Sequence, residues 1–104
     1  MKRVKYYAII EGYRRGLTDS WPMCKRCVSG YAQNWYKGFR SVEEAARYMK
    51  RNLPEYEGPY LYEVDGEYQE FWYKSEFMDF LEEKLEEQYR TRQSEKFRKR
   101  MKTV

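Results

Sequence analysis

The sequence predicts a small α+β domain, in which a three-stranded antiparallel sheet with two helices is followed by a β-hairpin and a long C-terminal helix. A chain of 104 residues can bury one modest core. Short segments rich in β-branched and aromatic residues alternate with segments whose apolar residues recur at helical spacing. Glycine and proline turn signals separate these segments, and the resulting order is β-β-α-β-α before the hairpin.

The three strands of the predicted sheet are short. Residues 5–11 (KYYAIIE) have the composition of a strand, and residues 17–19 form a short returning strand. The turn between them holds two glycines and two cations, Arg14 and Arg15, which we expect to be exposed. Residues 35–39 form the third strand. Its alternation places Tyr36 on one face, and Trp35 and Lys37 on the other.

Both helices of this module have capping signals. Ser20 is a predicted N-cap, and Pro22 fits in the first helical turn, where a missing N–H is harmless. The buried face of this short helix is predicted to carry Cys24, Cys27, Val28 and Tyr31. Ser41 and Glu44 form a capping box at the start of the second helix. Its buried face is predicted to carry Val42, Ala45, Ala46 and Met49.

The second half of the chain reads as a hairpin and a helix. Residues 60–64 and 67–73 flank the dipeptide Asp65-Gly66, a strong signal for a two-residue turn. Ser75 then caps a long helix. One face of this helix is predicted to carry Phe77, Met78, Leu81, Leu85 and Tyr89.

These elements divide the chain into a module over residues 1–52 and an extension over residues 53–104. The apolar face of the extension needs a partner surface, as does an isolated hairpin. It can pack back on the module or pair with a second copy, and we favour the second outcome. The homodimer would form through Phe77, Leu81, Leu85 and Tyr89.

The net charge of +4 hides a strong asymmetry along the chain. Residues 1–52 carry +8, residues 53–87 carry −10 and residues 88–104 carry +6. The basic first half has the electrostatic footprint of a nucleic-acid binder. The acidic segment offers a further hypothesis, since it can compete with nucleic acid for the basic half.

Aromatic residues alternate with Lys and Arg between residues 12 and 39. Such a surface suits nucleic acid, because rings stack on sugars or bases and cations neutralise phosphates. The alternative is a Tyr-rich core with a solvated basic face. No apolar run approaches the ~18 residues of a membrane span, and no signal peptide is evident. We therefore expect no membrane association, an intracellular protein (cytoplasmic or nuclear) and reduced cysteines.

Several short motifs stand in a fixed order over residues 4–51. They are Tyr6-Tyr7-Ala8-Ile9, Gly12, Gly16, Ser20-Trp21-Pro22-Met23-Cys24, Val28, Gly30-Tyr31, Tyr36-Lys37-Gly38-Phe39 and Ser41-Val42-Glu43-Glu44-Ala45. With this spacing, the segment resembles the hybrid-binding domain that precedes the catalytic domain of eukaryotic-type ribonuclease H. The same domain occurs in the viroplasmins of caulimoviruses. Residues 53–104 resemble no family that we identify.

The resemblance implies roles for individual residues. Trp21 and Tyr36 match the aromatic residues that pack on the sugars and phosphates of the DNA strand, with Tyr7 as a supporting ring. The alternative for Trp21 is a core residue. Lys37 matches the first of two lysines that grip a DNA phosphate. Gly38 replaces the second, so Arg40 or Lys25 would supply the missing charge.

The resemblance also implies a contact with the RNA strand. The loop of Gly30, Tyr31, Ala32, Gln33 and Asn34 matches the segment that enters the minor groove and reads 2′-hydroxyls. The 2′-hydroxyl is the group that distinguishes RNA from DNA. This family prefers small residues near the end of the loop, whereas Gln33 and Asn34 are larger. The larger side chains predict a weaker contact with the RNA strand than with the DNA strand.

The sequence argues against a metal site, a cofactor and catalysis. Cys24 and Cys27 form a single CxxC motif, and the chain contains no histidine to complete a zinc site. Core packing is the better interpretation of both. The usual general base is also missing. The carboxylates of residues 76–87 read as a solvated helix face, and the ribonuclease catalytic domain does not fit in the residues after the module.

The sequence thus predicts a non-enzymatic module that binds RNA/DNA hybrid or double-stranded RNA without sequence specificity. A separate ribonuclease is a further expected partner. The alternative is an assembly or protein-interaction adaptor that uses its C-terminal helix, since the viroplasmins that it resembles build inclusion bodies.

Overall fold

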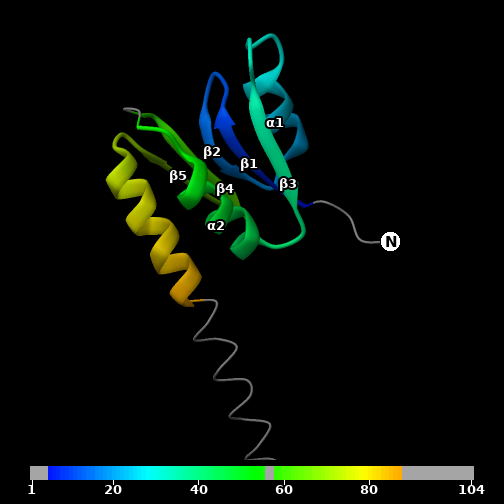
Figure 1. Ribbon diagram of the computed structural model, residues 1–104. Helices are drawn as coiled ribbons and strands as arrows, with labels where there is room; N and C mark the ends of the chain where they lie inside the picture. Colours follow the sequence, from blue (N-terminus) through cyan, green and yellow to red (C-terminus); the bar gives the residue numbers. More distant parts are fainter. Residues whose placement is uncertain (1–4, 56–57, 88–104) are drawn as a thin grey trace, which may run out of the picture.

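The computed structural model describes residues 5–55 and 58–87 and has an α+β fold. A single five-stranded sheet, in the order β3-β1-β2-β4-β5, carries helices on both faces (Figure 1). The elements are β1 (Tyr6–Glu11), β2 (Arg15–Thr18), α1 (Trp21–Val28), β3 (Trp35–Phe39), α2 (Val42–Asn52), β4 (Tyr60–Val64) and β5 (Glu67–Phe71). The chain is helical again over residues 74–87. The predicted element order is confirmed, but the sheet has five strands instead of three.

Local capping signals place α1 and α2 as predicted, whereas the helix over residues 74–87 begins one residue before its predicted cap, Ser75. The Ser20 hydroxyl accepts a hydrogen bond from the backbone N–H of Met23 at 3.3 Å. The Ser41 hydroxyl accepts one from the backbone N–H of Glu44 at 3.2 Å. Each bond satisfies a donor that the first helical turn leaves without an intrahelical partner. Tyr31 was predicted on the first helix but follows its end, because α1 stops at Val28.

The Asp65-Gly66 turn forms the predicted hairpin between β4 and β5. Asp65 has φ of 51° and Gly66 has φ of 82°, the left-handed conformations that a tight two-residue hairpin turn requires. β5 ends at Phe71, two residues before the predicted end of the strand.

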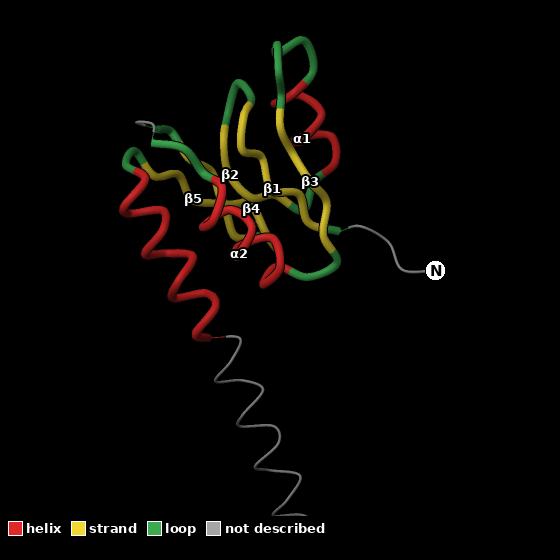
Figure 2. The backbone as a smooth tube through the Cα atoms, viewed as in Figure 1, coloured by secondary structure: helices red, strands yellow, loops and turns green. Residues whose placement is uncertain are grey.

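The hairpin is part of the same sheet as the first three strands, because β4 pairs with β2 in parallel (Figure 2). The register runs from Arg15 opposite Tyr60 to Thr18 opposite Glu63. Gly16 permits this close approach: a Cβ atom there would lie 2.0 Å from the carbonyl oxygen of Leu61. β4 thus covers an edge that a three-stranded sheet would leave open, and the predicted boundary after residue 52 falls inside one sheet.

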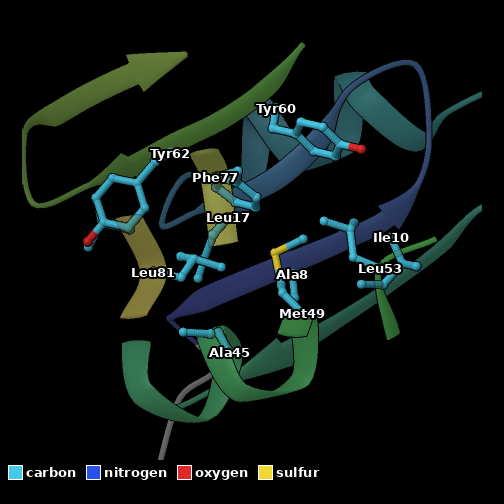
Figure 3. Close-up of a cluster of buried hydrophobic side chains, with 12 residues drawn as sticks. Ala8, Ile10, Leu17, Ala45, Met49, Leu53, Tyr60, Tyr62, Phe77 and Leu81 are labelled. Carbon is cyan, nitrogen blue, oxygen red and sulfur yellow. The ribbon is translucent and has the colours of Figure 1, made fainter. Parts of the chain in front are cut away.

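Two hydrophobic cores lie on opposite faces of the sheet. The larger core lies under α2 and the helix over residues 74–87 (Figure 3). Its buried members are Ala8, Ile10, Leu17, Ala45, Ala46, Met49, Leu53, Tyr60, Tyr62, Val64, Phe77 and Leu81. The smaller core lies under α1 and consists of Ile9, Cys24, Cys27, Val28 and Leu61. Val42 is only partly buried, at the margin of the larger core.

The apolar face of the C-terminal helix packs within the chain, which corrects the expectation of a homodimer through it. Phe77 and Leu81 are 0% exposed, and Phe77 stacks on Tyr60 with ring centroids 5.4 Å apart. Leu85 packs at the margin of the same core, and Tyr89 lies outside the described residues. The reason is that the hairpin adds Tyr60 and further apolar side chains to this face of the sheet. Among the described residues, no helix could cross a membrane.

Candidate nucleic-acid interface

Tyr7, Trp21 and Tyr36 form an aromatic cluster on the α1 face of the sheet. The ring centroid of Trp21 lies 5.3 Å from that of Tyr7 and 6.1 Å from that of Tyr36. Tyr36 pairs with Ile9 across β3 and β1, so Tyr36 and Tyr7 share a face. Trp21 reaches this face because it begins α1 directly after the Ser20 cap. The structure therefore brings together the three predicted aromatic residues.

This cluster faces solvent. Trp21 is 44% exposed and Tyr36 is 39% exposed, whereas Tyr7 is half-buried beneath them. Trp21 is thus a surface residue rather than a member of either core. Such exposed, adjacent rings can stack on sugars or bases without a change in the fold.

Lys37 lies on the other face of β3, away from this cluster. Its Nζ atom is 5.5 Å from the ring centroid of Phe39 and 5.4 Å from that of Tyr48 on α2. β3 is an edge strand. The sugar-phosphate backbone of a nucleic acid that passes this edge can therefore reach both Lys37 and Tyr36. Position 38 pairs with Tyr7, so Gly38 omits a side chain on the aromatic face.

Lys25 and Arg40 are exposed cations on the two elements that carry Trp21 and Tyr36 or directly adjoin them. Lys25 follows Trp21 by four residues and so shares its side of α1. Arg40 directly follows β3. Within the described part of the chain, neither side chain forms an ion pair. Both are available to phosphate, as the sequence-based prediction requires.

The loop of residues 30–34 is held against the end of α1 and the β1–β2 turn. The Asn34 amide donates a hydrogen bond to the carbonyl of Val28 at 3.0 Å. The Tyr13 hydroxyl donates one to the carbonyl of Gly30 at 3.1 Å. Tyr31 packs edge-on against Tyr13, with centroids 5.2 Å apart. Asn34 thus uses its amide N–H to anchor the loop, while the exposed Ala32 and Gln33 form the tip.

Of the two cations predicted to be exposed in the β1–β2 turn, only Arg14 is. Arg15 is buried on the α2 face, where its guanidinium donates to the carbonyl of Ile10 at 2.9 Å and to Glu11 at 2.7 Å. The strand alternation of β2, which begins at Arg15, explains the difference. The prediction placed the strand two residues too late.

The acidic hairpin lies at the opposite edge of the sheet from β3. Glu70 on β5 pairs with Arg14 at 3.2 Å, and Glu67 pairs with Lys84 at 2.8 Å. Glu63 accepts a hydrogen bond from Thr18 at 2.8 Å. The described part of the extension therefore leaves the aromatic cluster uncovered.

Cys24 and Cys27 are free thiols in the core under α1. Burial raises the pKa of Cys24 to about 11, and it also raises the pKa of Cys27. Both are therefore protonated at neutral pH and poor metal ligands. No cluster of three or more metal-binding side chains occurs in residues 5–55 and 58–87.

Sequence reasoning missed a cavity between α1 and the β1–β2 turn. It has a volume of about 260 Å³ and is lined by Tyr13, Arg14, Met23, Arg26 and Cys27. The exposed cation in the turn was the available signal, but nothing local shows that the turn folds against α1.

Comparison with known proteins agrees with the motif pattern. Residues 5–49 match the model of the Ribonuclease H1 N-terminal domain family. A ribonuclease H from Crithidia fasciculata is 34% identical over 44 residues, which are 42% of this chain and only 9% of that relative. The search of solved structures gave no match. The resemblance predicted from the motifs is therefore confirmed, over residues 5–49, as a match to the ribonuclease H1 N-terminal domain family.

Proposed function

We propose that this chain binds RNA/DNA hybrid or double-stranded RNA without sequence specificity. The observation that carries the proposal is the exposed ring of Trp21, which lies between Tyr7 and Tyr36. Two exposed cations lie on or next to the same elements, Lys25 on α1 and Arg40 directly after β3. The family match over residues 5–49 supports a nucleic acid as the ligand.

The duplex would meet the α1 face of the sheet at the β3 edge. A-like duplexes have a wide, shallow minor groove that displays 2′-hydroxyls. The Trp21 and Tyr36 rings would pack on the sugars of one strand, with Lys25, Lys37 and Arg40 on its phosphates. The loop over residues 30–34 would reach the 2′-hydroxyls of the other strand. Contacts to sugars and phosphates carry no base identity, hence the absence of sequence specificity.

Hydrolysis is not part of this proposal. The relative that matches is a ribonuclease H, yet the chain spans only 9% of its length. We propose a separate ribonuclease as the partner that cleaves the bound hybrid. An intracellular location belongs to the same proposal, because hybrids and double-stranded RNA form inside cells.

A titration with three duplexes of one sequence tests the function. Labelled RNA/DNA hybrid, double-stranded RNA and double-stranded DNA are each titrated with the full chain, with fluorescence anisotropy as the readout. We expect the hybrid and the double-stranded RNA to bind more tightly than the DNA. Equal affinity for all three duplexes would contradict the proposed contact with 2′-hydroxyls. No binding to any of them would refute the proposed function.

A further inference from the structure

A second aromatic and basic cluster lies on the other side of α1 from Trp21. On this helix, Trp21 and Lys25 are four residues apart and share one side. Met23 and Arg26 are three residues apart and share another, where they line the cavity of about 260 Å³. α1 therefore separates two surfaces that each combine an aromatic ring with cations.

The wall of this cavity is fixed in place by backbone contacts. The backbone N–H of Tyr13 donates to the carbonyl of Cys27 at 2.7 Å, and its hydroxyl donates to the carbonyl of Gly30 at 3.1 Å. Gly12 permits this approach, since a Cβ atom there would lie 2.6 Å from the Cys27 carbonyl oxygen. The ring of Tyr13 nevertheless stays 61% exposed. It is a preformed, solvent-facing platform.

The floor and the rim of the cavity differ in chemistry. Met23 is half-buried and Cys27 is buried, so these two lining residues form the inner, largely apolar part of the cavity. The rim carries Arg14 and Arg26. Arg26 is exposed and has no acidic partner in the part of the chain that the structure describes. An apolar floor with a cationic rim suits a ring that carries a phosphate.

Arg14 is held in position by the hairpin. One of its terminal nitrogens contacts the Tyr68 hydroxyl at 3.3 Å and the Glu70 carboxylate at 3.2 Å. A guanidinium has five N–H donors in a fixed fork, so further donors stay free for a ligand. β5 thus orients a cation at the mouth of a cavity that belongs to the module.

We propose that this cavity binds one unpaired nucleotide of a strand that continues past the duplex. The base would lie against Tyr13 over Met23, and its phosphate would lie between Arg14 and Arg26. The volume is below the roughly 300–1,000 Å³ typical of sites for drug-sized ligands, so it suits a single ring rather than a larger ligand. A paired base cannot enter, because its faces are stacked within the duplex. The inference rests on the proposed binding of the duplex itself.

The test compares one blunt hybrid with hybrids that carry a two-nucleotide overhang, on the 5′ or 3′ end of either strand. A stacked base contributes about 1–3 kcal/mol, equivalent to a roughly 5- to 150-fold gain in affinity. We expect a gain of at least about fivefold for one or more of the overhangs. If the blunt hybrid binds and no overhang improves it, this inference fails while the proposed function stands. If no duplex binds, both fail.

Variants and crosslinking then locate the nucleotide. Arg26→Gln should reduce the ratio of overhang to blunt affinity toward one. Lys25→Gln removes the same charge from the other side of α1, so it should weaken both duplexes and leave their ratio unchanged. An overhang with 5-iodouracil should photo-crosslink to Tyr13. A ratio that responds equally to both variants, or a crosslink that avoids Tyr13, would overturn the assignment.

Discussion

Trp21 and Tyr36 face each other across the junction of α1 and the edge strand β3, with ring centroids 6.1 Å apart. The two rings are tilted by 47° and both are exposed, so neither is needed to fill a core. Two large, adjacent aromatic rings exposed to solvent at a sheet edge indicate a binding surface rather than core packing. The first prediction follows from this pair.

Trp21→Ala is expected to weaken binding of the hybrid by about 1–3 kcal/mol, the range for a stacked aromatic side chain. The fold should survive because the side chain is 44% exposed. Trp72→Ala is the matched control, since Trp72 follows β5 at the far edge and is 58% exposed. Titration of hybrid and thermal unfolding of each variant give the answer. Unfolding of the Trp21 variant, or equal losses of affinity, would contradict the proposed site.

Binding should depend on salt to a modest extent. A surface with about three or four phosphate contacts implies a log–log slope of affinity against salt concentration near −3. Lys25→Gln should make that slope less negative by about 1, because it removes one contact. A salt series from 50 to 300 mM, about a sixfold range, measures both. A slope near zero would mean that nucleic acid is not the ligand.

Phe77→Ala is expected to lower the free energy of unfolding by about 3–5 kcal/mol, because it empties a fully buried site. The stacking contact with Tyr60 disappears with it. Phe77→Leu keeps much of the volume and should cost less. Urea unfolding measures the stability, and sedimentation measures the mass of each protein. If the wild-type protein is a dimer and Phe77→Ala makes it a folded monomer, the helix mediates a homodimer, contrary to the packing within one chain.

The two thiols should be unreactive in the folded protein. With a pKa of about 11, only about one molecule in a thousand has an ionised Cys24 at pH 8. Because this folded-state pKa is raised, the stabilisation is present below the ordinary pKa near 9 and is lost as pH rises through 11. A disulfide reagent should therefore react slowly in buffer and quickly in guanidinium. Cys24→Ala should weaken the loss of stability above pH 9, and fast reaction in buffer would contradict the buried placement.

Elements that depend on neighbouring residues could be predicted from the sequence. Ser20 and Ser41 cap their helices, and Asp65-Gly66 makes its turn, because each signal acts within about four residues. The pairing of β2 with β4 has no such signal. Nothing in either strand specifies which open edge it joins, so the sequence alone predicts the hairpin as part of a separate extension.

The candidate site also has some features that the sequence predicts and others that only the fold determines. Motif resemblance located Trp21 and Tyr36, and the structure places them together; their roles stay predictions. The opposite orientation of Lys37 follows from strand alternation and was predictable, whereas the burial of Arg15 depends on a strand boundary, which the sequence sets only to within a residue or two. The cavity beside Tyr13 exists only because the β1–β2 turn packs against α1, and no local sequence signal predicts that contact.

During synthesis, β2 is made well before β4, the strand with which it pairs in parallel. Thr18 and Glu63 are 45 residues apart in the chain. At about 5–20 residues per second, a ribosome needs roughly 2–9 s to make that stretch. During this interval the nascent β2 has an unpaired edge, the kind of strand that invites aggregation. Leu61 of β4 also belongs to the core under α1, so the sheet that carries the aromatic cluster stays incomplete until β4 is made. Any factor that binds the nascent protein early would meet an unfinished sheet.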